Sequence, residues 1–286
     1  MKKFLSLILA LVMVFSVCAL AGCGGKKDKE IVTAKVIEIN LTEEEYAFGV
    51  DKNQPELLTK ANEFIKAIKE NGKYEEICNK YFGDGTPSPV TSATLDESKD
   101  QLVVATNAQF EPFEYTEGDK YLGIDMEIAA LFAQHLGQEL VIVNMDFDAV
   151  CLTVGQHKCD IAMAGLTVRP DREEHVTFTD SYYTASQKLV VRSDDTKFND
   201  CKTAEDVEKI LKGFDKKIKI GVQSGTTGQF YCEGDADWGF DGYAVTTVGY
   251  KNGSLAVQDM LNGNISYVVI DSAPAQFITE SINELR

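Results

Sequence analysis

Short apolar runs alternate with helical patterns through residues 102–286, and this alternation limits the fold more than any other feature. Residues 102–106 are apolar and short enough for a buried strand. The helical pattern that follows has apolar residues on one face and ends at Gly137. Further strand-like runs occupy residues 140–143, 160–165, 188–191, 219–222, 244–248 and 266–270. Repeated β–α units predict an α/β fold with mostly parallel sheets and helices on both sheet faces.

The amino terminus carries the features of a secretion signal. Two lysines precede the uncharged residues 4–22, and Cys23 follows them. About 19 uncharged residues are also long enough to span a bilayer as a helix, so an uncleaved membrane segment is the alternative. The Leu-Ala-Gly-Cys sequence that ends at Cys23 resembles the lipobox of bacterial lipoproteins. We therefore expect residues 1–22 to be a signal peptide, Cys23 to be lipidated and residues 23–29 to form a tether.

Acidic residues outnumber basic ones, with 45 Asp and Glu against 28 Lys and Arg and a net charge of −17. Phosphate binding needs a concentrated basic surface, so we expect no nucleic acid partner. Solubility explains the acidity. With 44% hydrophobic residues, the chain can build one large domain or two smaller ones.

The spacing of cysteine and histidine gives no sign of a metal site or a disulfide framework. Seven cysteines become five once Cys18 leaves with the signal and Cys23 carries lipid, and an odd number cannot all be paired. No pair has CxxC spacing, and the three histidines are far apart in the sequence. A bridge between Cys201 and Cys232 stays open as an alternative. We expect no metal and no cofactor.

Loops that follow the predicted strands gather groups suited to a small ligand, because ligands of such sheets bind beyond the carboxyl ends of the strands. These loops are residues 107–115, 165–172 and 223–228, together with Asp271. They offer arginine, aspartate, hydroxyls and aromatic rings. A free α-amino acid, which has one carboxylate and one ammonium at fixed separation, fits this set.

Each group has a suitable role toward such a ligand. Arg172 would hold the carboxylate with two parallel donors, and Asp271 would receive the ammonium. The Gly-rich turn at residues 224–228 opens a helical segment whose free N–H groups would add donors to the same carboxylate. Phe110 and Phe147 would sandwich the aliphatic part of the ligand side chain. Its polar tip would face Asn107, Gln109 and Gln223.

Each of these residues also has a purely structural alternative. Arg172 could be a surface arginine in a charged loop, and Asp271 could cap the helix that follows it. The Gly-rich turn could be an ordinary strand–helix connection, and either phenylalanine could belong to the core. The residue pattern alone leaves both interpretations open.

A resemblance to a known family favours the ligand-binding interpretation. The blocks that carry it are residues 105–115, 123–128, 145–147, 160–167, 178–183 and 221–228. They resemble the polar amino acid-binding proteins of ABC importers, which are bacterial solute-binding proteins of family 3 with a two-lobed, type II periplasmic binding protein fold.

The family assigns a role to each matching position. The position of Arg172 grips the α-carboxylate, and that of Asp271 the α-amine. Backbone and hydroxyl contacts come from Gly165, Thr167 and Thr226, and the side-chain pocket is shaped by Asn107, Phe110, Phe147 and Gln223. The sequence departs from the family in two places: Asn107 stands where many relatives have aspartate, and Gln109 where many have glutamate.

The blocks come in an unusual order. Residues 35–50, 55–68 and 72–83 resemble the carboxy-terminal end of the family, yet here they come first. Residues 84–100 have no apolar periodicity and would be a linker that joins the ancestral ends. This order predicts a circular permutation, and a tandem array cut within a repeat is the alternative.

The resemblance implies two α/β lobes joined by crossing segments at residues 42–46 and 184–186. Lobe 1 would comprise residues 47–83 and 101–183, and lobe 2 residues 30–41 and 187–286.

The function that follows from the resemblance is transport. We expect an extracytoplasmic, lipid-anchored and monomeric protein that captures a free polar L-amino acid, glutamine-like or cationic, and passes it to an ABC importer permease. Ligand would close the lobes by hinge motion. Amino acid sensor modules and periplasmic dehydratases on the same fold are the alternatives. An enzyme needs a poised general acid or base, and no histidine lies in a predicted strand-end loop, so we do not expect an enzyme.

Overall fold

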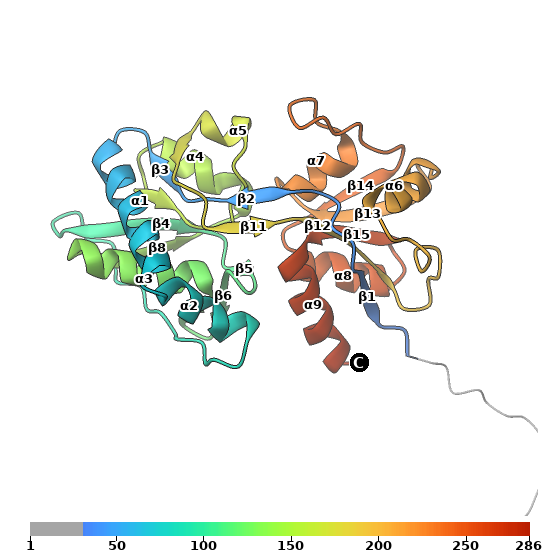
Figure 1. Ribbon diagram of the computed structural model, residues 1–286, viewed down its shortest axis with the longest axis horizontal. Helices are drawn as coiled ribbons and strands as arrows, with labels where there is room; N and C mark the ends of the chain where they lie inside the picture. Colours follow the sequence, from blue (N-terminus) through green and yellow to red (C-terminus); the bar gives the residue numbers. More distant parts are fainter. Residues whose placement is uncertain (1–30) are drawn as a thin grey trace, which may run out of the picture. The chain divides into compact units, whose positions relative to one another are not determined.

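Two five-stranded sheets, each with its own helices, are the main features of the computed structural model, which describes residues 31–286 (Figure 1). The predicted signal peptide, the tether and Cys23 lie outside the described residues. In the described part of the chain, no helix is both long enough and apolar enough to cross a membrane.

The first sheet forms what we call lobe 1. Its strands, in spatial order, are β10 (Val176–Phe178), β3 (Gly49–Asp51), β9 (Ile161–Ala162), β4 (Gln101–Thr106) and β8 (Glu139–Asn144). Its helices are α1 (Pro55–Glu70), α2 (Lys73–Phe82), α3 (Ile124–Leu136), η1 (Phe147–Ala149), α4 (Val150–Gly155) and α5 (Pro170–Glu173). A small sheet of β5 (Gln109–Phe110), β6 (Glu114–Glu117) and β7 (Lys120–Leu122) precedes α3. Helix α3 ends at Gly137, whose φ of 74° is the left-handed conformation that favours glycine.

The second sheet forms lobe 2. Its strands, in spatial order, are β1 (Ala34–Ile37), β12 (Gln187–Arg192), β15 (Tyr267–Asp271), β13 (Lys219–Gln223) and β14 (Thr246–Tyr250). Its helices are α6 (Ala204–Lys212), α7 (Thr227–Glu233), α8 (Gly253–Leu261) and α9 (Ser272–Glu284).

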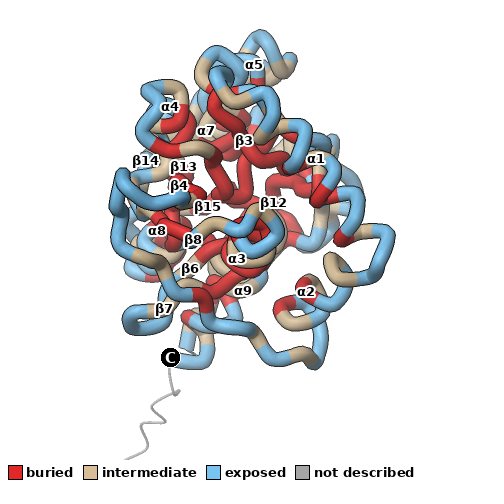
Figure 2. The backbone as a smooth tube through the Cα atoms, turned by 90° about the vertical axis from the view of Figure 1, so that its left-hand side faces the viewer, coloured by how far each residue is buried: buried red, intermediate tan, exposed pale blue. Residues whose placement is uncertain are grey.

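Successive apolar side chains of the strands point to opposite faces of the second sheet, which explains why helices cover both faces. In β12, Leu189 and Val191 pack on one face with residues of α6 and α7, whereas Val190 packs on the other face with residues of α8 and α9. Successive strand residues point to opposite faces, so an apolar run needs cover on both sides. Figure 2 shows the result: buried positions follow the strands, and exposed positions follow the outer turns.

Two short strands run between the lobes. Strand β2 (Glu44–Tyr46) lies beside β11 (Tyr183–Ala185) (Figure 1). The two pair in antiparallel register, with Tyr46 opposite Tyr183. In β2, Glu44 and Tyr46 are buried and Glu45 is exposed. The alternation of β2 therefore turns two polar side chains toward the junction of the lobes.

The sheets are mixed, and the expectation of mostly parallel sheets was wrong. Each large sheet has two parallel and two antiparallel pairings. Parallel neighbours need a crossover connection, which the helices supply for β4, β8 and β9 and for β13, β14 and β15. Strands β3 and β12 enter their sheets directly from the crossing strands, and they run antiparallel to β9 and β15.

The segment of residues 84–100 is attached to lobe 1 along its length. Val90 is 7% exposed, and its backbone pairs with Tyr121 in both directions. Ala93 N donates to Leu140 O at 2.8 Å, and Ser92 Oγ accepts a hydrogen bond from Ile142 N at 2.8 Å. The segment thus follows the edge of the sheet at β8, although its sequence has no strand-like pattern.

Candidate ligand-binding site

Arg172 is buried at the junction of the lobes. It lies in α5 of lobe 1 and is 7% exposed. Its Nη1 donates to Thr167 O at 2.8 Å, and its Nη2 donates to Gly225 O of lobe 2 at 3.1 Å. Its guanidinium carbon is 5.1 Å from the centre of the Phe147 ring. Burial lowers the pKa of Arg172, but a guanidinium stays charged in proteins, so the junction holds a fixed cation rather than a surface arginine.

Asp271 supplies a carboxylate to the same junction. It occupies the N-cap position of α9, but its side chain makes no capping hydrogen bond. Its Oδ1 accepts a hydrogen bond from the Tyr46 hydroxyl at 2.5 Å, and the residue is 5% exposed. Burial first, and then the charge of Glu44, raise the pKa of Asp271 to about 7. The side chain is therefore directed to the crossing strand and does not act as a helix cap.

Glu44 is a second buried carboxylate, which the sequence did not single out. It is 2% exposed, and its Oε2 accepts from Thr167 Oγ1 at 2.7 Å. Its Oε1 accepts from Thr42 Oγ1 at 2.6 Å and from Gln187 Nε2 at 3.0 Å. The residue stands in a run of three glutamates, where only the alternation of β2 tells which of them faces inward.

Gly165 occupies a position that only glycine fits. Its φ is +53°, and an added Cβ would lie 2.8 Å from Phe110 Cε1. Its N–H donates to Asp125 Oδ2 at 2.9 Å, and Tyr182 donates its hydroxyl to Asp125 Oδ1 at 2.7 Å. The loop between β9 and α5 is thus held so that Phe110 packs directly against its backbone.

Two threonines link the lobes beside Arg172. Thr227 Oγ1 of lobe 2 lies 3.4 Å from Thr167 Oγ1 of lobe 1. Thr226 is at the N-cap position of α7, but its hydroxyl donates to Gln223 O at 2.8 Å and does not cap the helix. The Gly-rich turn therefore brings the start of α7 against the loop that carries Arg172.

Amide side chains form a further contact between the lobes. Gln223 Nε2 donates to Asn107 Oδ1 at 3.2 Å, and Asn107 Nδ2 donates to Met145 O at 2.6 Å. Gln223 is 1% exposed, and its Oε1 has no hydrogen-bond partner among the described residues. Gln109, which was expected beside them, is exposed and accepts a hydrogen bond from Asn252 Nδ2 at 2.5 Å.

The structure thus brings most of the candidate residues to one junction between the lobes. Arg172, Thr167, Phe147, Gln223, Thr226 and Asn107 are joined by the contacts above, Phe110 and Gly165 pack together, and Asp271 is tied to β2 by Tyr46. Together with Glu44, these residues combine one cation, two carboxylates, amides and aromatic rings. Such a set can hold a zwitterion by ion pairs and hydrogen bonds.

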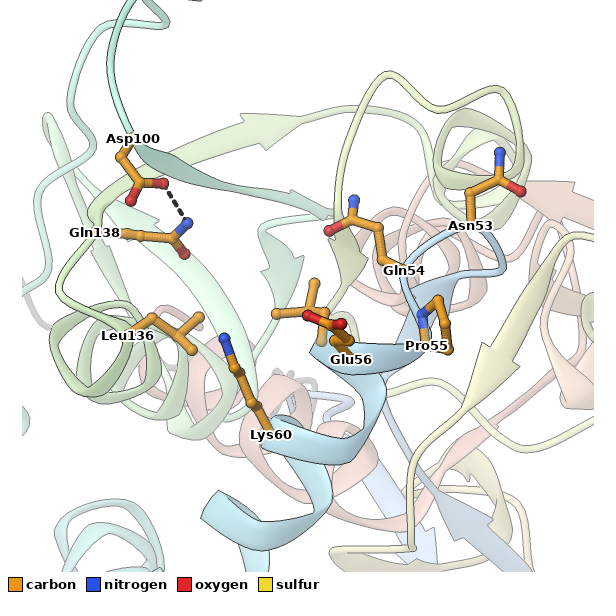
Figure 3. A pocket seen from close by; sticks show the side chains of 9 residues that line it. Asn53, Gln54, Pro55, Glu56, Lys60, Asp100, Leu136 and Gln138 are labelled. Carbon is orange, nitrogen blue, oxygen red and sulfur yellow. Dashed lines mark hydrogen bonds between the residues drawn. The ribbon is translucent and has the colours of Figure 1, made fainter.

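The hollow in Figure 3 is a separate feature of lobe 1. It lies between the start of α1 and the end of α3, where Gln138 Nε2 donates to Asp100 Oδ1 at 2.6 Å. None of the residues at the junction lines it.

Metal binding and disulfides find no support in the described residues. Within residues 31–286 there is no group of three or more His, Cys, Asp or Glu side chains placed to hold a metal ion. Cys201 and Cys232 are both free, so the structure does not contain the bridge that the sequence left open.

Comparison with known proteins gives a family and a fold. Residues 17–84 and 102–263 match the model of the bacterial extracellular solute-binding proteins, family 3. The arginine-binding extracellular protein ArtP of Bacillus subtilis (strain 168) is 35% identical over 99 residues, which are 35% of this chain and 39% of that protein. The putative ABC transporter arginine-binding protein 2 of Escherichia coli (strain K12) is 30% identical over 184 residues, 64% of this chain and 66% of that protein. The chain thus spans less than two thirds of these curated relatives.

Solved structures agree with this match. The holo arginine-binding protein ArgBP of T. maritima aligns at 32% identity with a TM-score of 0.53, covering 66% of this chain and 78% of that one. An ancestral amino acid-binding protein, AncCDT-1, described as a precursor of cyclohexadienyl dehydratase, aligns at 27% identity with a TM-score of 0.54, covering 64% and 75%. The chain therefore belongs to the bacterial extracellular solute-binding proteins of family 3 and has the two-lobed α/β fold, type II, of periplasmic amino acid-binding proteins.

Proposed function

We propose that the protein binds a free amino acid at the junction of its lobes and delivers it to an ABC importer. The observation that carries the proposal is that each lobe buries one charged side chain near Glu44 of the crossing strand, Arg172 from lobe 1 and Asp271 from lobe 2, without an ion pair between the two among the described residues. A zwitterion offers the complementary pair of charges. Relatives that are named arginine-binding and histidine-binding proteins support the same function.

Different residues at the junction would bind different groups of the ligand. Arg172 takes the α-carboxylate, with help from Thr167, Thr226 and the backbone at Gly165. Asp271 takes the α-ammonium, since no other cation pairs with this buried carboxylate in the described part of the chain. The side chain of the ligand lies among Phe110, Phe147, Asn107 and Gln223.

A cationic amino acid suits the site better than a glutamine-like one. Glu44 and Asp271 outweigh Arg172, so a bound zwitterion leaves one surplus negative charge. The unpartnered Oε1 of Gln223 also calls for a hydrogen-bond donor on the ligand side chain, because a buried acceptor without a partner is costly. An arginine, lysine or histidine side chain meets both requirements.

Binding without catalysis is part of the proposal. Of the three histidines, His157 pairs with Asp51 and His135 packs beside Phe64 in lobe 1, while the backbone N–H of His175 donates to Arg172 O at 2.9 Å. The polar groups at the junction are of the kinds that hold an amino acid backbone, which favours binding over catalysis. A sensor module or a dehydratase-like enzyme on this fold is the alternative function.

The amino terminus and the family support a proposal on location and partner. We propose that residues 1–22 direct secretion, that Cys23 carries the lipid that anchors a monomer to the outer face of the membrane, and that the permease of the importer is the partner. The lipobox-like sequence before Cys23 and the extracellular family support this placement.

We also propose that the chain is a circular permutation of the family, with the lobe and linker boundaries given above. Three observations support it. The family match is broken at residues 85–101. The structural alignments cover 64–66% of this chain, which is about the share that lies after residue 100. The side chain of Asn283 in α9 hydrogen-bonds to both the N–H and the C=O of Ala34 in β1. In an unpermuted relative the chain would continue from α9 into β1, and this contact supports that the two elements are neighbours.

A thermal-shift screen of the twenty common amino acids tests the function. A ligand at 100 times its Kd adds about 2.7 kcal/mol to the free energy of unfolding. We expect arginine, lysine or histidine to raise the Tm most, whereas glutamate and aspartate leave it unchanged. No shift with any amino acid would contradict the proposed function, and a shift only with acidic ones would contradict the assignment of the charges.

A further inference from the structure

Arg169 is a second buried arginine at the junction, and the proposed ligand contacts do not use it. It is 3% exposed. Its Nη2 donates to Asp235 Oδ2 at 2.7 Å, and its Nε donates to Asp171 Oδ1 at 2.9 Å. Its guanidinium carbon lies 4.1 Å from the centre of the Phe230 ring and 5.3 Å from that of Trp238. The charge is thus held by two carboxylates, one from each lobe, and by two aromatic rings.

The partners of Arg169 come from the opposite lobe. Arg169 directly precedes α5, which packs against β10 of lobe 1. Phe230 lies in α7, which packs against β13 and β15 of lobe 2, and Asp235 and Trp238 follow that helix. The contact therefore connects the lobes at a point outside the proposed ligand contacts.

The lobe 2 side of this contact is held in shape by its own hydrogen bonds. Asp235 Oδ1 accepts from Asp237 N at 3.0 Å and from Trp238 N at 3.2 Å. The backbones of Asp235 and Phe240 are bonded in both directions, at 2.9 and 2.8 Å. The loop therefore presents a carboxylate and an indole in fixed positions, and the hydrogen bond from Arg169 keeps the pKa of Asp235 below its ordinary value.

We propose that Arg169 is a positioning residue for ligand capture, which docks between Phe230, Asp235 and Trp238 only when the lobes are closed and so slows ligand release. We call this contact the Arg169 latch. The proposal rests on the proposed function, because it assigns the latch a role in holding a ligand that the site residues bind.

Arg169 should slow ligand release because it has more contacts when the lobes are closed than when they are apart. With the lobes apart, Arg169 keeps only Asp171, which is on its own lobe, and the guanidinium is hydrated. With the lobes together, it gains a charge-assisted hydrogen bond and two ring faces away from water, where such contacts are strongest. A contact present only in the closed form should change the dissociation rate more than the association rate.

Stopped-flow kinetics of the Arg169→Ala variant test the latch. Trp238 is the only tryptophan in the sequence, so its emission reports directly on the contact. The probe is an equimolar mixture of the twenty common amino acids, followed by each single amino acid that binds. We expect dissociation to become about 10- to 100-fold faster while association changes little, and Arg169→Lys to restore only part of the loss because lysine lacks the planar fork.

Lys251 provides the matched control. It also bridges the lobes, with Asp146 at 3.3 Å, but the two side chains are 72% and 64% exposed. Exposed pairs contribute little, so Lys251→Ala should change the dissociation rate less than about threefold. If Arg169→Ala behaved like Lys251→Ala, the latch would be excluded.

A second measurement separates the latch from the proposed function. Acrylamide quenching of Trp238 is recorded for the wild type and for Arg169→Ala, with and without the amino acid mixture. We expect the variant to be quenched more strongly in at least one of the two conditions, and equal quenching in both would overturn the latch. A thermal shift that is absent with every amino acid would instead contradict the proposed function, and quenching of the unliganded protein would then decide on the latch alone.

Discussion

The hydroxyl of Tyr46 donates a hydrogen bond to Asp271 Oδ1 at 2.5 Å, which joins a crossing strand to the last strand of lobe 2. The carboxylate is thereby held where the chain passes between the lobes. It has a hydroxyl and the nearby charge of Glu44, but no cation pairs with it within residues 31–286. A ligand ammonium at this point would complete its set of partners.

Replacing Asp271 with asparagine should remove ligand binding without lowering stability. Asparagine keeps an oxygen for Tyr46, but it cannot pair with an ammonium, and the loss should be about 3–5 kcal/mol, or more than 100-fold in Kd. At about pH 8 the variant should also unfold at a Tm no lower than that of the wild type, because it removes a carboxyl whose pKa is raised from 3.8 to about 7. Stability is lost as the pH rises between these two pKa values, and the full loss is present at about pH 8. Calorimetry and thermal unfolding check both. A variant that binds within threefold of the wild type would exclude Asp271 from the site.

Ligand affinity should fall as the pH falls below 7. In the unliganded protein the pKa of Asp271 is raised to about 7, so the carboxyl must release a proton before it can pair with an ammonium. Because the proton must leave first, ligand binding is strong above the pKa of Asp271 and is lost below it. We expect Kd to rise about tenfold from pH 8 to pH 6, with about one proton released at the lower pH. Calorimetry in two buffers of different ionisation enthalpy measures both quantities.

The Tyr46→Phe variant gives a matched test of this pH dependence. The hydroxyl of Tyr46 stabilises the charged form of Asp271, so its removal should raise the pKa of Asp271 and shift the pH profile to higher pH. A profile that is flat in the wild type, or unmoved in the variant, would contradict the role of Asp271.

Replacing Arg172 with lysine should weaken binding about 100-fold, and alanine should weaken it further. Lysine keeps the charge, but the three donors on its single nitrogen cannot make two parallel hydrogen bonds to a ligand carboxylate and also reach Thr167 O and Gly225 O. Calorimetry gives the affinities. Arg192→Ala is the control, because that arginine pairs with Asp194 inside lobe 2 and should leave binding unchanged. Lysine at position 172 with wild-type affinity would mean that the carboxylate binds elsewhere.

The elements of the fold were predictable because their apolar runs have clear lengths and ends. Strands β4 and β8 and helix α3 lie where the sequence predicts them, and the left-handed Gly137 ends α3 as expected. Strand direction was not predictable in the same way, because the antiparallel pairings depend on where the crossing strands enter each sheet.

Some residues of the candidate site could be selected from the sequence, and others could not. Residues in strand-end loops, such as Arg172 and Asp271, could be selected from the sequence, although their roles stay predictions. Glu44 and Arg169 could not be selected from the sequence, because each lies in a run of charged residues. Their roles depend on contacts with distant parts of the chain, Thr167 for Glu44 and Asp235 for Arg169. Such contacts depend on how the lobes meet, which local patterns do not encode.

Replacing Asn107 with aspartate should shift the ligand preference toward arginine or lysine. The new carboxylate would keep the hydrogen bond from Gln223, but it would lose the one to Met145 O and face that carbonyl, so stability should fall by about 1–3 kcal/mol. Competition binding across the amino acid panel and thermal unfolding measure the two effects. Gln109→Glu adds the same charge at an exposed position and should leave the ranking unchanged. An unchanged ranking in Asn107→Asp would exclude this residue from the side-chain pocket.

The circular permutation predicts that the chain can be opened in the linker and closed at its present ends. A rearranged protein that starts near Lys99 and joins Arg286 to residue 30 through a short Gly/Ser link should fold and bind the same amino acid with similar affinity. Asn283 already bonds to Ala34 on both sides of its backbone, so the new connection is short. Residues 94–100 are exposed, so opening the chain there leaves the buried Val90 in place.

A second rearrangement, opened inside β4, is the matched control. That strand pairs with both β8 and β9, so breaking it should prevent folding. Circular dichroism, thermal unfolding and calorimetry compare the two proteins. Because both carry the same new link between Arg286 and residue 30, a difference between them reports on the opened position alone. If the protein opened at Lys99 were as unfolded as the one opened in β4, the ends of lobe 2 would not be ancestral neighbours, and the permutation would be wrong.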